Sequence, residues 1–285
     1  MLKRRLRRRA TVKKRRLRYA GNCLEPIVNP VNRGASLLLT FALTVGVYAA
    51  DVPRDPKADE IAKEMMKAMG GQDAWNKARF LRFDFKVVAA GKEVVNRAHL
   101  WDKQTGKYRL EDMTKQGQSR VSLLNTGDQQ GTAYVAGKRI DGDDAKVAVK
   151  DAYGAFINDM YWLAMPWKWM DQGVHLKYLG KKSSGGKEYD VVQLTFDHVG
   201  LTPGDRYEAF VSPQTHMMEH WEYKLQGGGT GQWDWEYKPV GALKIVANHT
   251  SKDGKSSINM GDVRVLASVD DPFFADPART LATLK

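Results

Sequence analysis

Residues 152–170, AYGAFINDMYWLAMPWKWM, differ from the rest of the chain, most of which has the pattern of β-strands. Apolar residues recur here at the three- and four-residue spacing of a helix with an apolar face. They are Tyr153, Phe156, Ile157, Met160, Tyr161 and Ala164. Trp162, Leu163 and Met165 add apolar side chains on other sides, and a helix that is apolar nearly all round is normally buried. Pro166 lacks an amide hydrogen and is expected to end the helix. We therefore predict a buried helix followed by an aromatic-rich turn.

On both sides of this stretch, apolar and polar residues alternate with a period of two. In residues 81–87, apolar and charged residues alternate, which is typical of a half-buried strand. Similar runs, joined by turns that contain glycine, follow up to residue 266 and predict an antiparallel meander of about eleven strands. A single sheet of this size must curl. The predicted fold class is α+β: one open, strongly curved antiparallel sheet, or half-barrel, with helices covering its concave face.

A shorter helix is expected before the first strand. Asp55 can cap it, Pro56 suits its first position, and the pair Gly70-Gly71 is a typical end. Its apolar stripe is rich in methionine, which fills irregular gaps in cores, so this helix is expected to pack against the sheet.

The net charge of +12 is not spread over the chain. Residues 1–50 hold 12 Lys and Arg and one acidic residue, leaving 33 basic and 32 acidic residues in 51–285. The body is therefore nearly neutral, which argues against nucleic acid as a partner.

The sequence divides into a basic leader with a signal peptide, residues 1–50, and a single domain, residues 51–285. We see no internal repeat and no change of composition after residue 56.

The leader has the features of an export signal. Residues 35–50 form an apolar run of about sixteen residues that ends in small residues. This run is short for a membrane span, which needs about 20 residues. We predict cleavage after Ala49 or Ala50 and a periplasmic, non-spanning mature chain; an uncleaved anchor is the alternative. Val28 or Val31 is a candidate for the true start of translation. The one cysteine, Cys23, precedes the cleavage site, so the mature chain has neither disulfide nor thiolate chemistry.

Several segments resemble one known superfamily. They are Leu163–Trp167 with Asp171–Gly180, Tyr189–Phe196, Tyr207–Thr215, Val240–Asn248, and the run from Asp253 to Val265. Together they resemble the LolA/LolB-like outer-membrane lipoprotein-sorting proteins over residues 57 to about 278. This resemblance implies an open, strongly curved antiparallel sheet whose hollow is covered by helices. It also implies lipid or lipoprotein acyl chains as ligands, although no residue here matches the functional arginine of the carrier or the protruding leucine loop of the receptor. The chain looks closer to uncharacterised relatives than to a true carrier.

The motif His216-Met-Met-Glu-His220 has the spacing of an inverted zinc-protease site, which requires a helix. Here alternation continues through Leu225, and in a strand the two histidines would lie about 13 Å apart, too far to share a metal. The glycine-rich run 227–231 leads into a strand rather than a helix, so no phosphate site is expected. Asp234 and Glu236 share one strand face, as sugar-binding carboxylates can, but nothing opposes them. We predict no catalytic residue, no metal and no cofactor.

Clustered aromatic and methionine side chains are typical of both cores and apolar pockets. The candidate residues for an apolar ligand cavity are Phe83, Phe85, Trp101, Phe156, Met160, Trp162, Met165, Trp167, Trp221 and Trp235. The leading hypothesis is a non-enzymatic periplasmic binding protein for an acyl chain, with the inserted helix as a lid. The alternative is a structural or sensing module of the envelope that acts through a protein partner and whose hollow is a filled core.

Overall fold

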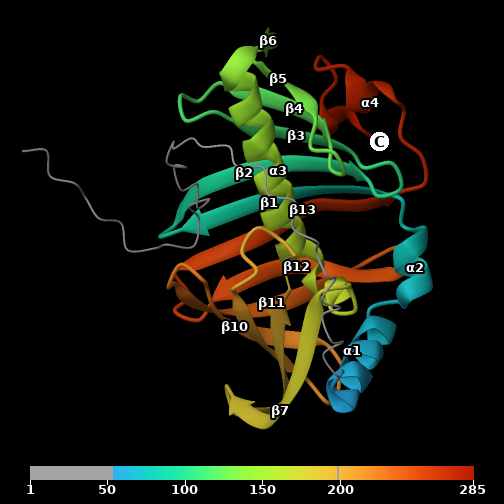
Figure 1. Ribbon diagram of the computed structural model, residues 1–285, viewed down its shortest axis with the longest axis vertical. Coiled ribbons are helices and arrows are strands. Elements are labelled where there is room, and N and C mark those ends of the chain that lie inside the picture. Colours follow the sequence, from blue (N-terminus) through green and yellow to red (C-terminus); the bar gives the residue numbers. More distant parts are fainter. Residues whose placement is uncertain (1–53, 198) are drawn as a thin grey trace, which may run out of the picture. The chain divides into compact units, whose positions relative to one another are not determined.

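A computed structural model describes residues 54–197 and 199–285. The expectations for the leader, its cleavage site, Cys23 and the start codon, and the residue His198, lie outside these described residues. No helix in 54–197 or 199–285 is long and apolar enough to cross a membrane. Figure 1 shows the arrangement of the elements.

The described residues form one antiparallel sheet of thirteen strands. The strands are β1 (Phe80–Ala89), β2 (Lys92–Asp102), β3 (Lys107–Met113), β4 (Ser119–Asn125), β5 (Gly131–Val135), β6 (Lys138–Ile140), β7 (Val174–Ser184), β8 (Lys187–Phe196), β9 (Arg206–Val211), β10 (Met218–Lys224), β11 (Thr230–Val240), β12 (Leu243–Ser251) and β13 (Ser256–Leu266). Their order is β6-β5-β4-β3-β2-β1-β13-β12-β11-β10-β9-β8-β7, so the first and last strands are neighbours. The sheet is open, with β6 and β7 at its edges. The predicted α+β class with one open, half-barrel-like antiparallel sheet is confirmed, with thirteen strands instead of about eleven, while the covering of a concave face by helices stays a prediction.

The helices are short except for one. They are α1 (Pro56–Ala68), α2 (Gln72–Lys77), α3 (Gly142–Ala164) and α4 (Pro272–Ala275), with the 3-10 helices η1 (Met165–Lys168) and η2 (Leu281–Thr283). The predicted boundaries of α1 are confirmed: the Asp55 carboxylate accepts hydrogen bonds from the amides of Lys57 (3.0 Å) and Ala58 (3.1 Å). Its other oxygen accepts from the Tyr178 amide on edge strand β7 (2.9 Å), which ties the start of α1 to the sheet.

Helix α3 begins ten residues earlier than the sequence predicts, at Gly142 instead of Ala152. Its first turns carry apolar residues at helical spacing, Ala148 and Val149 among them, but these are mostly small alanines among exposed charged residues, a weaker signal than the large apolar residues of the second half. Asp143 and Asp144 in the first turn suit the positive end of the helix dipole. The helix ends at Ala164, and Pro166 lies in the first turn of η1, where an amide hydrogen is not needed.

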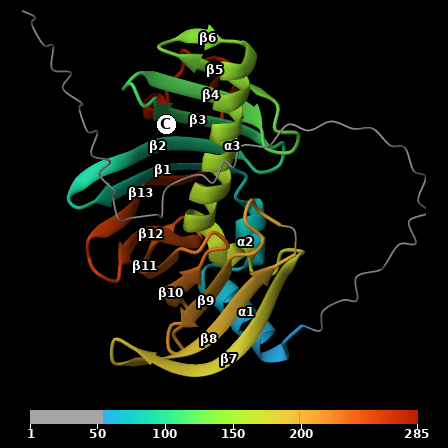
Figure 2. The ribbon, with the colours of Figure 1, turned by 60° about the vertical axis from the view of Figure 1, so that its left-hand side comes forward.

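Helix α3 is the connection between the two edges of the sheet. It follows β6 at one edge and leads through η1 to β7 at the other. Its 23 residues correspond to about 34 Å, and Figure 2 shows it crossing the strands. We call the face that packs against α3 the inner face. Helices α1 and α3, η1 and inner-face side chains share one hydrophobic core.

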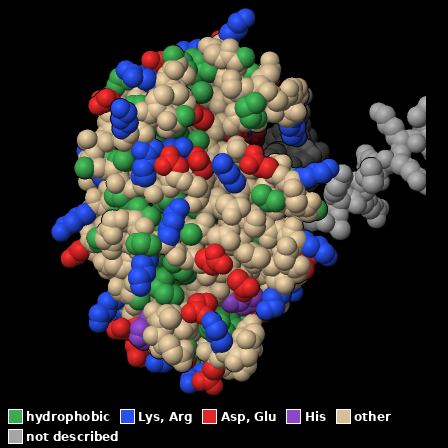
Figure 3. Space-filling view, turned by 180° about the vertical axis from the view of Figure 1, so that it is seen from behind, with side chains coloured by type: hydrophobic (Ala, Val, Ile, Leu, Met, Phe, Trp, Pro, Cys, Tyr) green, Lys and Arg blue, Asp and Glu red, His purple; other side chains and the backbone are tan. Residues whose placement is uncertain are grey.

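The C-terminal segment covers part of the opposite, outer face. Leu100 of β2 packs there with Phe273, Leu281 and Leu284. The fully buried Arg109 of β3 donates hydrogen bonds to the backbone carbonyls of Phe273 (3.1 Å), Asp276 (2.9 Å) and Arg279. In the view from behind, charged side chains of both signs are spread over the surface (Figure 3).

Candidate functional site

The candidate site is the interface between α3, η1 and the inner face of β9–β12. Trp162 lies at its centre, with its ring centroid 4.9 Å from that of Trp221, 5.2 Å from Trp233 and 4.9 Å from His249. Trp235 lies 5.1 Å from Trp221 and 4.3 Å from His249. We call these five residues the tryptophan cluster. Three strands (β10, β11 and β12) and a helix supply them, so the cluster exists only in the folded chain.

Tyrosines extend the tryptophan cluster towards β8 and β9. The rings of Tyr207 and Trp221 stack 4.9 Å apart, and Tyr161 of α3 lies 5.5 Å from Tyr207. Phe196 packs edge-on against both tyrosines. Burial raises the pKa of both tyrosine hydroxyls well above the usual range, so each remains a neutral hydrogen-bonding group at physiological pH.

Some polar atoms in this interface have no hydrogen-bond partner among the described residues. They include the indole nitrogens of Trp221 and Trp235, the Tyr161 hydroxyl and Nδ1 of His249. Nε2 of His249 is hydrogen-bonded to the Trp162 carbonyl (3.0 Å), so Nε2 carries the hydrogen and Nδ1 is an unused acceptor. A buried polar group without a partner costs about 1–3 kcal/mol. The interface therefore offers two indole donors, a hydroxyl and an acceptor to any polar group that enters it.

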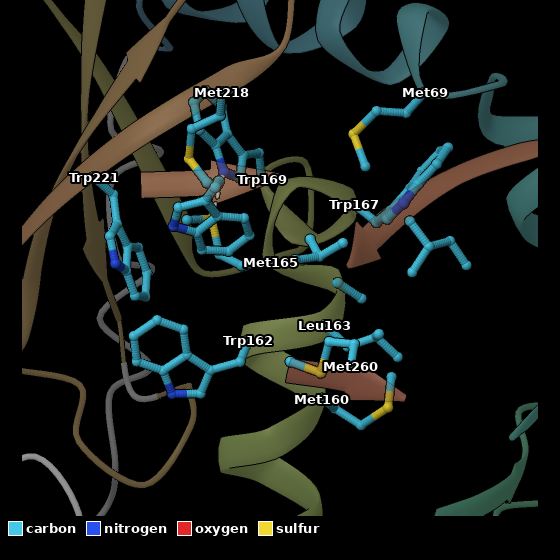
Figure 4. Close-up of a cluster of buried hydrophobic side chains, with 14 of the residues drawn as sticks. Met69, Met160, Trp162, Leu163, Met165, Trp167, Trp169, Met218, Trp221 and Met260 are labelled. Atoms are coloured by element: carbon cyan, nitrogen blue, oxygen red, sulfur yellow. Dashed lines mark hydrogen bonds between the residues drawn. The ribbon is translucent and has the colours of Figure 1, made fainter. Parts of the chain in front are cut away.

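The end of the interface near η1 is rich in methionine. Trp169 is fully buried, and its indole nitrogen donates to the Met165 sulfur (2.8 Å). Figure 4 shows Met69, which directly follows α1, and methionines of α3, η1, β10 and β13 around the tryptophans. Eight of the eleven methionines in the chain belong to the core: Met65, Met66, Met69, Met160, Met165, Met217, Met218 and Met260. Because methionine side chains are flexible, this end can repack at low cost.

A buried carboxylate in the last third of α3 fixes the helix to the sheet. Asp159 is 0% exposed, and its oxygens lie 3.0 and 3.1 Å from Nη1 of Arg97 on β2. Nε2 of His99, also on β2, lies 3.1 Å from the same carboxylate, and Nδ1 of His99 lies 2.8 Å from the Tyr108 hydroxyl. Asn158 donates a further hydrogen bond (2.8 Å). We call Asp159, Arg97 and His99 the α3 latch.

The ionisation states of the latch follow from its surroundings. Burial opposes the charge on Asp159, but the Arg97 guanidinium and the hydrogen bond from His99 outweigh it, so the pKa of Asp159 is below its usual value. Burial lowers the pKa of His99 in spite of the nearby carboxylate. The latch is therefore an ion pair of Asp159 with Arg97, supported by a neutral histidine.

The ten predicted cavity residues all belong to the core or pack against it. Phe83 and Phe85 come from β1, Trp101 from β2, and Trp221 and Trp235 from β10 and β11; the others are on α3 and η1. Nine are buried, and Trp101 is partly buried against Phe156, with ring centroids 5.0 Å apart. They do not form one group: Trp162, Trp221 and Trp235 meet in the tryptophan cluster, whereas Trp167 stacks on Trp75 of α2 at 5.1 Å.

Sequence reasoning missed the α3 latch, His249 and the two tyrosines. Asp159 carried a signal, because it is a single acid between the apolar residues Phe156 and Met160 of a buried helix. Its partners on β2, Arg97 and His99, carried no such signal, since polar residues alternate with apolar residues in most of the strands.

The structure also places the other motifs. Residues 218–224 are strand β10, as predicted, and His216 lies in the turn before it with a positive φ of 56°. His220 lies 2.7 Å from Asp234, on the outer face. Trp233 and Trp235 are buried on the inner face, and Asp234 and Glu236 are exposed on the other, as the alternation predicted. No group of three or more His, Cys, Asp or Glu in 54–197 and 199–285 is placed to hold a metal ion.

One family model matches the chain, over residues 133–251, and it is described as a family of unknown function, DUF6503. The matched range runs from β5 to β12 and contains α3, η1 and the tryptophan cluster. A comparison with curated proteins gives no match.

Several solved structures are similar to this chain. A LolA superfamily protein from Nitrosomonas europaea has 13% identity, with 76% of this chain and 96% of that chain covered and a TM-score of 0.44. A DUF1329 family protein from Desulfovibrio piger has 11% identity, with 79% and 98% covered and a TM-score of 0.45. Lipoprotein LppX from Mycobacterium tuberculosis has 8% identity, with 74% and 100% covered and a TM-score of 0.29. The similar structures thus include a member of the superfamily that the sequence resembles.

Proposed function

We propose that this protein is a non-enzymatic, exported binding protein that holds an acyl chain of a lipid or lipoprotein between α3 and the inner face of the sheet. One observation carries the proposal: the interface beneath α3 combines flexible apolar side chains with buried polar atoms that have no protein partner. An acyl chain joined through an ester or amide matches both properties. The carbonyl oxygen would accept from the indole nitrogens, and the alkyl part would replace apolar contacts.

The mechanism is displacement of α3 as a lid. Each CH₂ group that leaves water contributes about 0.8 kcal/mol, so a dodecyl chain supplies roughly 9 kcal/mol against the cost of opening the interface. The helix joins the two edge strands and is fixed to the sheet in its last third by the α3 latch. Opening α3 therefore requires Asp159 to leave Arg97 and His99.

The test measures uptake of 12-bromododecan-1-ol by the purified full chain, because bromine quenches indole fluorescence on contact. We expect saturable quenching, and faster quenching in Asp159→Asn because the ion pair of the latch is lost. Asp151→Asn is the matched control: this residue is also on α3, is exposed, and lies 3.8 Å from Arg120. In parallel, native mass spectrometry of protein purified without detergent is expected to show a bound mass that organic solvent releases.

A second function is favoured by how tightly the interface is filled. Nine of the ten predicted cavity residues are buried against one another or their neighbours. This packing fits a structural or sensing module of the envelope whose core is permanently closed and whose ligand is another protein. Absence of quenching in both the wild type and Asp159→Asn, together with a bare protein mass, would refute the acyl-chain proposal and support the closed core that this second function requires.

A further inference from the structure

A depression with a volume of about 340 Å³ lies on the surface beside α1. It is lined by Lys63, Met66, Lys67, Gly71, Gln72 and Met170. These residues come from α1, from the turn that follows it, and from the segment after η1. The volume is within the range of small-molecule sites, which begins at about 300 Å³. We call this feature the α1 depression.

The floor of the α1 depression is apolar and continuous with the core. Met66 is a buried core residue, and Met170 is partly buried and packs against the same core. Nη2 of Arg54 lies 3.1 Å from the Met170 sulfur, but its charge is matched by Asp59 at 2.8 Å. An alkyl chain in the depression would therefore lie directly on the methionine-rich end of the interface beneath α3.

The rim carries two positive charges without a partner. Lys63 and Lys67 are exposed and lie one helical turn apart on α1, and neither forms an ion pair with a described residue. Glu64 pairs with neither. Lysines nearby are matched, since Lys57 lies 3.1 Å from Glu60 and Lys168 lies 2.7 Å from Asp171. Like charges four residues apart destabilise a helix by about 0.2–0.5 kcal/mol, so an anion between these two lysines would remove a local repulsion.

We propose that the α1 depression binds the anionic end of an amphiphile, a carboxylate or phosphate, whose alkyl chain enters the core beside Met66 and Met170. This proposal rests on the proposed acyl-chain function and adds an anionic head group at the surface. The anion lies at the α1 depression, and the ester or amide carbonyl that meets the indole nitrogens lies further along the same ligand. Lys63 and Lys67 hold the anion, and the two methionines contact the first methylene groups.

The experiment compares dodecanoate with 1-dodecanol, which has the same alkyl length and no charge. Binding to the full chain is measured by calorimetry for the wild type and for Lys63→Gln/Lys67→Gln. We expect dodecanoate to bind at least tenfold more tightly than dodecanol to the wild type, and to lose that advantage in the double variant. Lys57→Gln, on the same helix but outside the depression, is the matched control. Thermal unfolding verifies that all the variants fold.

Other outcomes separate this proposal from the function on which it rests. If dodecanol binds and the affinity for dodecanoate is unchanged in the double variant, the α1 depression is not the anion site, while the acyl-chain function stands. If neither ligand binds to the wild type, both proposals fail. Inorganic phosphate and dodecyl phosphate form a second pair of ligands. If the two ligands bind with equal affinity, the site binds a free anion and the alkyl chain adds nothing. That result would contradict the proposal that the ligand is an amphiphile.

Discussion

At the scale of single residues, the interface beneath α3 depends on a few polar side chains inside an apolar core. Asp159 contributes the one buried carboxylate of α3, and His249 contributes a neutral imidazole beside Trp162 and Trp235. Such groups stabilise the fold only in one protonation state. The stability of the protein must therefore depend on pH in a way that a purely apolar core would not show.

Burial lowers the pKa of His249 to about 3, against the opposing effect of its hydrogen bond with the Trp162 carbonyl. The unfolded chain, with a histidine pKa near 6.5, then binds more protons, so stability falls as the pH drops below about 6.5 and continues to fall towards the folded pKa. Between pH 7 and pH 5 this one residue accounts for about 2 kcal/mol.

The variant His249→Gln keeps an amide donor and cannot be protonated. Urea unfolding at pH 7 and pH 5 is expected to show a smaller loss of stability in the variant than in the wild type, by about the same 2 kcal/mol. The remaining loss in the variant comes in part from His99, whose pKa is also lowered by burial. Equal losses of stability in the two proteins would show that burial does not keep His249 neutral in the folded protein.

At the scale of elements, α1 is positioned at both ends. Asp55 ties its start to β7, and at its other end the Met69 carbonyl accepts a hydrogen bond from the Lys244 amide of β12 (2.8 Å). Gly70 follows with a φ of +116°, and a Cβ there would lie 2.3 Å from the Ala242 carbonyl oxygen. The floor of the α1 depression therefore depends on a backbone approach that only glycine permits.

We expect Gly70→Ala to destabilise the protein by about 2–3 kcal/mol, since it adds a steric clash to an unfavourable φ. Gly71→Ala is the control, because Gly71 also has a positive φ (+89°) but a Cβ there meets no atom within 4 Å. The control is expected to lose only about 1–2 kcal/mol. Similar unfolding midpoints for the two variants would show that the contact with Ala242 carries little weight.

At the scale of the described residues as a whole, each face of the sheet is partly covered by a segment from elsewhere in the chain. Helix α3 lies on the inner face, and the C-terminal segment lies on the outer face of β2 and β3. Arg109 is fully buried between β3 and that segment, where its guanidinium lies 2.7 Å from Glu111 in addition to its three backbone carbonyl partners. The C-terminal segment is thus part of the fold, held by Arg109 together with the apolar contacts of Leu100 and hydrogen bonds from Arg264 to the Leu284 carbonyl and from the Leu281 amide to Glu111.

We expect Arg109→Met to release the C-terminal segment, because methionine fills part of the space but cannot donate to the carbonyls. Loss of a buried ion-pair partner costs about 3–5 kcal/mol. Hydrogen exchange followed by mass spectrometry is expected to show faster exchange in residues 272–285 and unchanged protection in β8–β12. Uniformly faster exchange in all strands would contradict a local role for Arg109, and Arg109→Lys, which keeps the charge, is the intermediate control.

Local sequence patterns predicted most of the fold. The alternation in residues 81–87, the glycine turns, and the Asp55–Pro56 start and Gly70–Gly71 end of α1 each depend on neighbours within a few residues. The predicted start of α3 was wrong because its first ten residues are mostly exposed and their apolar stripe consists of small side chains such as Ala148 and Val149 among charged residues. The candidate residues were located correctly in the core, but whether a ligand can enter among them remains a prediction.

The sequence by itself determined the antiparallel sheet, the inserted helix and the apolar character of what lies between them, because backbone preferences and periodicity are local properties. Only the tertiary structure decided that α3 joins the two edges of the sheet and that Asp159 meets Arg97 and His99 across 60 residues or more of sequence. It also decided that Lys63 and Lys67 lie beside Met170 without an ion-pair partner in residues 54–197 and 199–285. Such pairings arise from the order of strands and the direction of side chains after folding, and no spacing in the sequence encodes them.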